Sequence, residues 1–358
     1  MNPGQSLANG SAGIALFHLE TGNYAAAIRA LRDAVADGVS IADGASLFHG
    51  APAIAFVLAA TDHPQLATAR AVTAEATATL ARRRVEAAHR RIDRRAQPHY
   101  AEYDLIRGLT GLGVVLRRLG DHDLLRHVLD YFVRLTEPVH DLPGWWCHNS
   151  PHHAQPAPGG GHANFGMAHG ITGPLALLSL ALLDGTTVAG HTTAIERICR
   201  WLDTWQRHTH GITWWPQTLT RPELHASTPT QQGPLRPSWC YGTPGIVRAQ
   251  QLAAHALGDR DRQHRSETAF TTCITDPTQT VQLIDRGLCH GTAGLLATAR
   301  RITTDAHTPI PLPVVERLHQ QFAASGNEPA GLLEGTTGSG LVDTATTSTV
   351  WDACLLLA

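Results

Sequence analysis

A glycine-rich step recurs seven times along the chain and constrains the fold more than any other feature of the sequence. Each copy consists of a glycine, two further residues, usually a second glycine, and then a run of aliphatic residues. Self-similarity at intervals of this length is typical of a repeat architecture. The copies begin 40 to 72 residues apart, and the second has Ala53 in place of the later glycine; the first glycines are Gly10, Gly50, Gly108, Gly170, Gly242, Gly291 and Gly335.

Each interval between two steps holds a second segment with periodic apolar residues. Examples are residues 25–35, 124–135 and 194–205, in which apolar residues recur at spacings of three and four. This spacing is typical of an amphipathic helix with one buried face. Alternating β-branched runs and hairpin dipeptides are scarce, so few strands are expected. The repeating unit is therefore predicted to be a pair of helices, the apolar one inside and the amphipathic one outside.

The terminal copies decide between an open and a closed arrangement of such pairs. Tandem helix pairs can stack as a solenoid, which needs polar caps, or close into a ring. Both terminal copies are as apolar as the middle ones. We therefore predict an all-α fold, an α/α toroid in which seven helix-pair repeats form a double-layered barrel and glycine-rich steps start the inner helices. Residues 1–358 are expected to form one domain. Only nine residues precede the first step, so its outer helix is expected from elsewhere or upstream.

Composition excludes several classes of protein. With 43% hydrophobic and 16% charged residues, the chain can bury a large core and is not disordered. A formal net charge of −2 argues against a general nucleic-acid binder. No signal peptide and no apolar stretch of ~20 residues is evident, so no membrane span and a cytoplasmic location are expected. All 28 basic residues are arginine, which indicates a GC-rich bacterial genome, such as an actinobacterial one.

A ring of inner helices would bring the residues before each step together at one mouth. Polar residues gathered at one end of an apolar barrel form a candidate site. Cys240 and Cys289 stand two residues before the glycines of their copies. The positions directly before the seven glycines hold Asn9, His49, Arg107, His169, Tyr241, His290 and Glu334.

Two cysteines at equivalent repeat positions, one of them followed by histidine, indicate a zinc site. Cys240, Cys289 and His290 would leave a fourth position open for water or substrate, as in catalytic zinc sites. The alternative is buried structural cysteine, the usual state of a free thiol. We expect that state for Cys147, Cys199, Cys273 and Cys354, although Cys147 has an alternative as a ligand because His148, His152 and His153 lie close.

Several segments together resemble the lanthionine synthetase C family of lanthipeptide cyclases. They are WCYG and CHG, NFGMAHGITGPLALL (164–178), EYDLIRGLTGLG (102–113) and GLLEGTTGSGLV (331–342). The resemblance covers nearly the whole chain and implies a toroid with a central Zn²⁺ bound by Cys240, Cys289 and His290. Members add peptide cysteine thiols to dehydroalanine or dehydrobutyrine, which forms lanthionine or methyllanthionine rings. The implied substrate is a dehydrated precursor peptide, leader plus core.

The resemblance also implies catalytic residues. His169 matches the histidine of the AHG motif and Asp104 the aspartate of YDL, while Arg236 precedes Cys240 by four residues and Tyr241 follows it. The chemistry of these residue types agrees. A histidine can donate and accept a proton near neutral pH. Asp104 could hold the histidine tautomer or handle the thiol proton, and Arg236 could stabilise the enolate oxygen. The alternative for Asp104 and Arg236 is an ordinary ion pair at the mouth.

Three further segments bear on partners. No dehydratase or kinase-like region is evident, so a stand-alone cyclase with a separate dehydratase is expected. The arginine-rich segment 81–96 predicts a helix whose seven arginines form an isolated positive patch. This patch is either a solvated outer face or a docking surface for a leader peptide, since such leaders are generally acidic. Residues 148–166 and 214–240 are predicted as long loops that cover the site, line a peptide channel or are passive.

Two other functions compete with a cyclase. The first is a non-catalytic zinc-containing scaffold that binds a thiol such as glutathione or a partner modification enzyme. His169 and Asp104 argue against it, because a binding scaffold needs no acid–base pair. The second is a glycosidase or prenyltransferase subunit, which would need paired carboxylates or an Asp-Cys-His zinc set at the steps. Neither set appears there.

Overall fold

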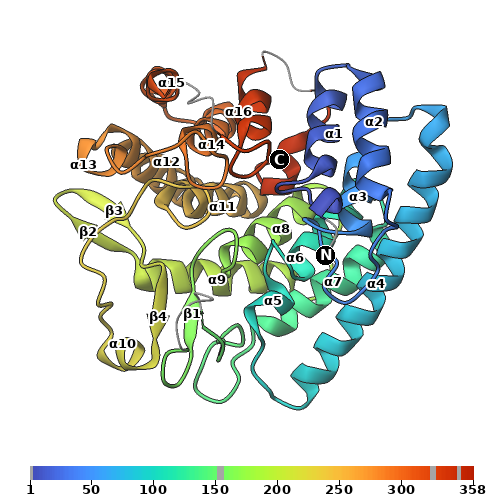
Figure 1. Cartoon of the computed structure of the whole chain (residues 1–358). Coiled ribbons are helices and arrows are strands. Elements are labelled where there is room, and N and C mark those ends of the chain that lie inside the picture. The colour runs from blue at the N-terminus through green and yellow to red at the C-terminus, as the bar shows by residue number, and fades with distance from the viewer. Residues whose placement is uncertain (1–2, 151–156, 323–327, 345–347) are drawn as a thin grey trace.

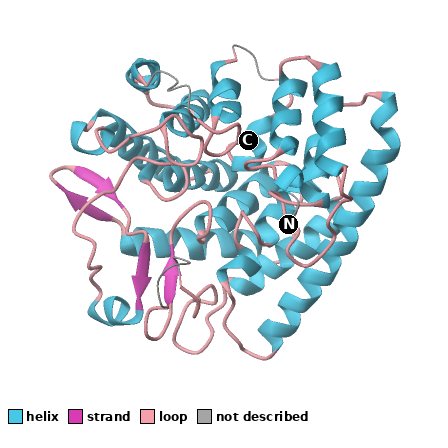
Figure 2. Cartoon of the chain, viewed as in Figure 1, coloured by secondary structure: helices cyan, strands magenta, loops and turns pink. Residues whose placement is uncertain are grey.

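The computed structural model of the chain is a double ring of helices and describes residues 3–150, 157–322, 328–344 and 348–358 (Figures 1 and 2). Each inner helix begins at a predicted glycine step. These helices are α1 (Ser11–Glu20), α3 (Ala51–Leu58), α6 (Leu109–Leu119), α8 (Thr172–Leu183), α11 (Thr243–Leu257), α14 (Thr292–Asp305) and α16 (Thr336–Asp343).

An outer helix follows each of the first six inner helices and packs against it. The outer helices are α2 (Tyr24–Val35), α4 (Ala67–Asp93), α7 (His122–Leu135), α9 (His191–Trp205), α12 (Arg260–Thr275) and α15 (Leu312–Gln321). The expectation that the first copy takes its partner from elsewhere is wrong, because α2 follows α1 directly. After α16 the described chain ends in the short 3-10 helix η3 (Trp351–Leu355).

Backbone hydrogen bonds between neighbouring step loops close the ring. Ala168 N–H donates to Cys240 O (3.3 Å), and Cys240 N–H donates to Cys289 O (3.2 Å). The series continues through Leu333 to the first copy, where Leu333 N–H donates to Ala8 O (3.1 Å). Helix α16 accordingly packs beside α1, as the red and blue helices in Figure 1 show. The predicted α/α toroid is confirmed, and closure places all seven helix starts around one mouth.

The repeated glycines are required because the chain turns tightly before each inner helix. In the fourth copy, a Cβ atom on Gly170 would lie 2.5 Å from the carbonyl oxygen of Asn164. A Cβ on the second glycine, Gly173, would lie 2.8 Å from the carbonyl oxygen of Met167. Both distances are far below van der Waals contact, so only glycine allows this approach of the backbone. The step is thus a compact loop that ends in a helix N-terminus.

The loops beside the mouth contain more structure than the sequence predicted. Strand β1 (His162–Asn164) pairs antiparallel with β4 (Thr218–Thr220), and β2 (Arg207–Thr209) pairs with β3 (Ile212–Trp214). Figure 2 shows these strands at one side of the helical ring. The predicted loop 214–240 also contains α10 (Arg221–Ala226). The β1–β4 pair joins the two predicted loops, which lead to His169 and Cys240.

The core fills the space between the two layers of helices. Short helical elements complete the described chain: η1 (Pro3–Gln5), η2 (Pro64–Leu66), α5 (Tyr100–Tyr103) and α13 (Pro277–Thr280). Trp239, next to Cys240, is fully buried and donates from Nε1 to the carbonyl oxygen of Leu355 in η3 (2.9 Å). The chain terminus thereby braces the loop that carries Cys240. In the parts that the structure describes, no helix is both long and apolar enough for a membrane span.

Candidate active site

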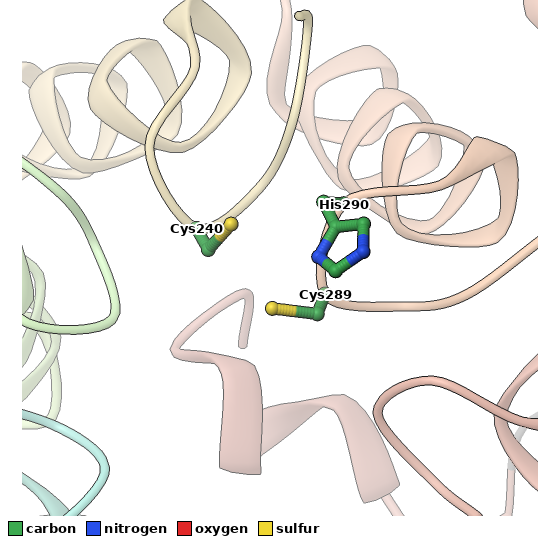
Figure 3. A group of neighbouring side chains, drawn as sticks. All are labelled: Cys240, Cys289 and His290. Atoms are coloured by element: carbon green, nitrogen blue, oxygen red, sulfur yellow. The ribbon is translucent and has the colours of Figure 1, made fainter. Parts of the chain in front are cut away.

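The step loops at the mouth bring a Cys–Cys–His cluster together. Cys240 precedes α11, and Cys289 and His290 precede α14. Their possible ligand atoms, two Sγ and one imidazole nitrogen, all lie within 4.8 Å of one another. Figure 3 shows both sulfur atoms and one ring nitrogen facing a common centre. Cys240 is 7% exposed, whereas Cys289 and His290 are half-buried, so the cluster is open on the side toward the mouth.

Contacts within the cluster favour a negative charge on Cys240 even without a metal. A hydrogen bond from the Cys289 thiol lowers the pKa of Cys240 well below its ordinary value, against the effect of burial, and His290 lowers it further. The same contact with Cys240 raises the pKa of Cys289 and of His290. These shifts favour the thiolate form of Cys240 and the protonated form of His290. The N-termini of α11 and α14 add partial positive charge at this mouth, which also favours anions there.

Asp285 lies beside the third member of the cluster. Its Oδ2 is 3.5 Å from His290 Nε2, and its Oδ1 accepts a hydrogen bond from Gly287 N–H (2.8 Å). Because Nε2 faces this carboxylate, Nδ1 is the nitrogen that remains for a metal. A carboxylate behind a ligating imidazole orients the ring and increases its basicity.

Asp104 and His169 form a directly hydrogen-bonded pair in the adjacent part of the mouth. His169 Nδ1 lies 2.6 Å from Asp104 Oδ2, and Asp104 Oδ1 accepts from Arg107 N–H (2.8 Å). The Asp104 side chain is fully buried, whereas that of His169 is 30% exposed. An ionised carboxylate only accepts hydrogen bonds, so the imidazole proton lies on Nδ1 and Nε2 faces the mouth. The Asp104 ion pair is therefore with a histidine and not with Arg236.

Tyr241 connects this pair to the Cys–Cys–His cluster. Its ring centroid lies 6.3 Å from that of His169, and its sequence neighbour is Cys240. Burial raises the pKa of Tyr241. Arg236 is half-buried at the same mouth, where its charge acts on Cys289 and on His290. The structure thus brings all seven sequence-predicted site residues to one mouth.

The other four cysteines, Cys147, Cys199, Cys273 and Cys354, are buried, as predicted. Burial raises the pKa of Cys147 to about 12, of Cys199 to about 11 and of Cys273 to about 12. The same cause raises the pKa of Cys354. Cys147 contacts Tyr103 Oη (3.3 Å) and is fully buried. His152 and His153, named with Cys147 as an alternative cluster, lie outside the described residues.

The arginine-rich segment is a helix, as predicted, but its seven arginines do not form one isolated patch. Arg91 points inward to a bidentate contact with Glu102, from Nη2 to Oε1 (2.7 Å) and from Nε to Oε2 (3.3 Å). Arg84 donates to the carbonyl oxygens of Ala45 and Ala101 (3.2 and 3.1 Å). Arg82, Arg83 and Arg90 are exposed beside the carboxylates of Glu75, Asp43 and Glu86. Arg94 and Arg95, directly after the last residue of α4, are also exposed.

Sequence reasoning missed four residues that contact the site. They are Tyr100, whose ring packs edge-on against His169 (5.5 Å), Asn164, Ser238 and Asp285. A repeat signal could have indicated two of them. The position six residues before the glycine holds Asn164 and Asp285 in their copies, and it also holds Arg236. The residue at this position contacts the first glycine of the step in the turn, so its Cβ atom lies beside the mouth.

Comparison with known proteins agrees with the fold. Among curated proteins the chain is similar to the nisin biosynthesis protein NisC of Lactococcus lactis subsp. lactis, with 23% identity over 205 residues. That alignment covers 54% of this chain and 48%, about half, of the relative. A solved nisin cyclase superposes with a TM-score of 0.83 at 20% identity, over 100% of this chain and 93% of that one. At this identity the superposition bears on the fold alone.

Fold and site together define a helical toroid with a Cys–Cys–His cluster and an Asp–His pair at one mouth. The family described as lanthionine synthetase C-like protein matches residues 3–356. The chain belongs to this family, as the WCYG and CHG segments predicted.

Proposed function

We propose that the protein is a zinc-dependent lanthipeptide cyclase that acts on a dehydrated precursor peptide. The observation that carries the proposal is the hydrogen-bonded Asp104–His169 pair (2.6 Å) next to a cluster of two thiols and one imidazole. A scaffold that only binds a thiol would need the Cys–Cys–His cluster but not the Asp104–His169 pair. Membership in the family supports this reaction class.

The cluster fits zinc by donor type, charge and spacing. Sulfur and imidazole nitrogen are the ligands that zinc prefers, and a tetrahedral site places them roughly 3.5–4 Å apart. The separations within 4.8 Å are close to this value, so small side-chain rotations suffice. Cys240, Cys289 and the Nδ1 atom of His290 would hold the ion, with Asp285 behind the imidazole. When bound, zinc would acidify a peptide thiol in the fourth position, so that its sulfur reacts as a thiolate.

His169 is proposed as the residue that carries the proton. Its Nε2 atom accepts the proton of the peptide thiol. The sulfur forms a bond to Cβ of the dehydro residue, and the π electrons shift toward the carbonyl oxygen as an enolate. His169 then returns the proton to Cα, so the reaction is a net isomerisation. Arg236 is proposed to stabilise the enolate oxygen by charge.

Asp104 is proposed as the residue that orients His169. Both carboxylate oxygens are engaged and the side chain is fully buried, so it has no path for a proton to or from the peptide. It holds the Nδ1 proton of His169 and stabilises the imidazolium that forms during the reaction. We therefore propose the first of the two roles that the sequence left open for Asp104, that of holding the histidine tautomer.

Asp104→Asn should therefore slow cyclisation about tenfold or more while leaving the bound metal unchanged. The asparagine would keep its oxygen toward Arg107 N–H and turn its amide toward His169, which moves the imidazole proton to Nε2 and removes the base. General acid–base catalysis contributes about 10²–10⁴ in total. Single-turnover rates and zinc content measure the two effects. A variant that is as fast as the wild type would refute the orienting role.

Cyclisation by the purified protein is the direct test of the proposed function. The reaction leaves the peptide mass unchanged and consumes free thiols. The zinc-loaded protein should lower the number of thiols that an alkylating reagent labels in a dehydrated peptide, as read by mass spectrometry. The same peptide without the protein is the control. If the protein binds thiols or a partner enzyme but never consumes the peptide thiols, the scaffold alternative holds.

The exposed end of α4 is proposed as a docking surface for an acidic leader. Replacing Arg90, Arg94 and Arg95 with glutamine should weaken binding of the full precursor about threefold or more, since exposed ion pairs each contribute about 0.2–1 kcal/mol. The affinity of the wild type should also fall as salt is added, because exposed charges are screened beyond about 8–10 Å at ordinary ionic strength. Fluorescence anisotropy of a labelled precursor measures both.

A matched variant distinguishes docking from a general effect of charge. Arg260, Arg265 and Arg317 are exposed on α12 and α15, and their replacement with glutamine removes the same charge elsewhere on the outer layer. This control should bind the precursor as the wild type does. Equal affinities of both triple variants and the wild type at low salt would show that the end of α4 is only a solvated face.

A further inference from the structure

Asn164 links strand β1 to Tyr241. It is the last residue of β1, lies opposite Thr218 of β4 and is 1% exposed. Its side-chain Nδ2 donates a hydrogen bond to Tyr241 Oη (3.0 Å), across 77 positions of sequence. A buried amide that contacts a residue at the mouth in this way needs an explanation beyond packing.

The orientation of the Asn164 amide is determined by its second contact. Its Oδ1 atom accepts a hydrogen bond from Gly166 N–H (2.9 Å). A flipped amide would bring its NH₂ group against this N–H, where neither group can accept. The backbone holds the residue as well, because its carbonyl oxygen accepts from Ile171 N–H (3.0 Å). The NH₂ group is therefore directed at Tyr241 and can only donate.

This hydrogen bond leaves the phenol proton of Tyr241 available for a different acceptor. A phenol oxygen that accepts from Asn164 cannot also donate to it, so the O–H remains available to another acceptor. The ring cannot move away easily, because Gly166 lies so close that a Cβ atom there would be 2.8 Å from Tyr241 Cδ1. The ring also lies beside that of His169 (6.3 Å). The free O–H is thus held next to the proposed proton carrier.

We propose that Asn164 is a positioning residue that makes Tyr241 a hydrogen-bond donor to the substrate carbonyl oxygen. This inference rests on the proposed cyclase function. The carbonyl oxygen gains negative charge when the sulfur adds to Cβ, and a donor held in place before the reaction stabilises that charge. No proton leaves Tyr241, because His169 supplies the one at Cα. Asn164 acts only through Tyr241 and does not touch the reacting atoms.

Asn164→Asp tests the direction of the hydrogen bond with almost no change in shape. The carboxylate still accepts from Gly166 N–H but now also accepts from Tyr241, which turns the phenol proton away from the substrate. We expect kcat to fall about a hundredfold, as for removal of an oxyanion donor, with little change in KM or zinc content. Tyr241→Phe should give a similar loss, and the double variant should be no slower than either single variant.

Asn149→Asp is the matched control. It adds the same charge to the neighbouring loop and keeps the oxygen that accepts from Tyr100 N–H (3.2 Å), so its kcat should be close to that of the wild type. Two results would overturn the proposal. One is a kcat of Asn164→Asp within threefold of the wild type. The other is an equal loss when the change is made in the Tyr241→Phe background, which would show that Asn164 acts independently of Tyr241.

A spectroscopic measurement tests the same contact without any turnover. The tyrosine doublet in ultraviolet resonance Raman spectra reports whether a phenol oxygen accepts or donates. The difference between wild type and Tyr241→Phe isolates Tyr241 and should show an acceptor, whereas Asn164→Asp should show a donor. A donor signature in the wild type would refute the inference. If the acceptor signature appears but no peptide is cyclised, the proposed function fails and the hydrogen-bond assignment stands.

Discussion

Replacing either Cys240 or Cys289 with alanine should remove the bound zinc and abolish cyclisation. Each variant leaves two of three ligands, and the lost thiolate also supplies the negative charge that attracts the cation. The remaining thiol and imidazole would hold the ion too weakly to survive dialysis. Metal analysis of the purified variants measures zinc per chain, which should be close to one in the wild type, and thiol alkylation of a dehydrated peptide measures cyclisation.

Two controls make this result specific to the cluster. Cys199→Ala removes a thiol of the outer layer that is only 2% exposed, and it should keep zinc and activity. Removal of zinc from the wild type by a chelator should stop the reaction, and added zinc should restore it. Full zinc in both Cys240→Ala and Cys289→Ala would show that the ion is held elsewhere or that the cysteines are structural.

His169→Ala should keep zinc and the fold but lose about 10²–10⁴ of the cyclisation rate, the usual contribution of general acid–base catalysis. The loss arises because no group then accepts the thiol proton and returns it to Cα. Asp104 cannot replace it, since this carboxylate is fully buried behind the imidazole. Single-turnover kinetics on a zinc-loaded protein separate this loss from any change in peptide binding.

The pairing of Asp104 with His169 also predicts the rate of the double variant. Because Asp104 acts through His169, the double variant His169→Ala/Asp104→Asn should be no slower than His169→Ala alone. His264→Ala, the same change at an exposed position of α12, should be as fast as the wild type. A near-normal rate of His169→Ala with the authentic dehydrated peptide would assign the proton transfer to another group.

The helical ring and the cluster could be predicted because both follow from local pattern and from symmetry. The glycine steps mark each inner helix, since no other residue tolerates the close backbone contacts at Gly170 and Gly173. Equivalent positions of a closed repeat must meet at one mouth, so Cys240 and Cys289 could be paired without knowledge of any distance. The family resemblance added roles for His169 and Asp104, which the fold then brought within hydrogen-bond distance.

The arginines of α4 show where such reasoning fails. Consecutive charges in a sequence give no sign of which face of the helix is covered. In the folded chain Arg91 meets Glu102, while Arg94 and Arg95 stay exposed. The direction of each side chain depends on how α4 packs against the inner layer, and packing is a property of the assembled ring. The predicted single patch was therefore wrong.

The sequence alone determined the repeat, the helix starts and the residue types that meet at the mouth, because these depend on backbone sterics and on periodicity. Only the tertiary structure decided how the side chains pair there. The hydrogen bond from Asn164 to Tyr241 and the contact of Asp285 with His290 depend on amide orientation, loop curvature and strand pairing. The physical reason is directional: hydrogen bonds require angles and distances of fractions of an ångström, which arise only when separate loops are held against one another.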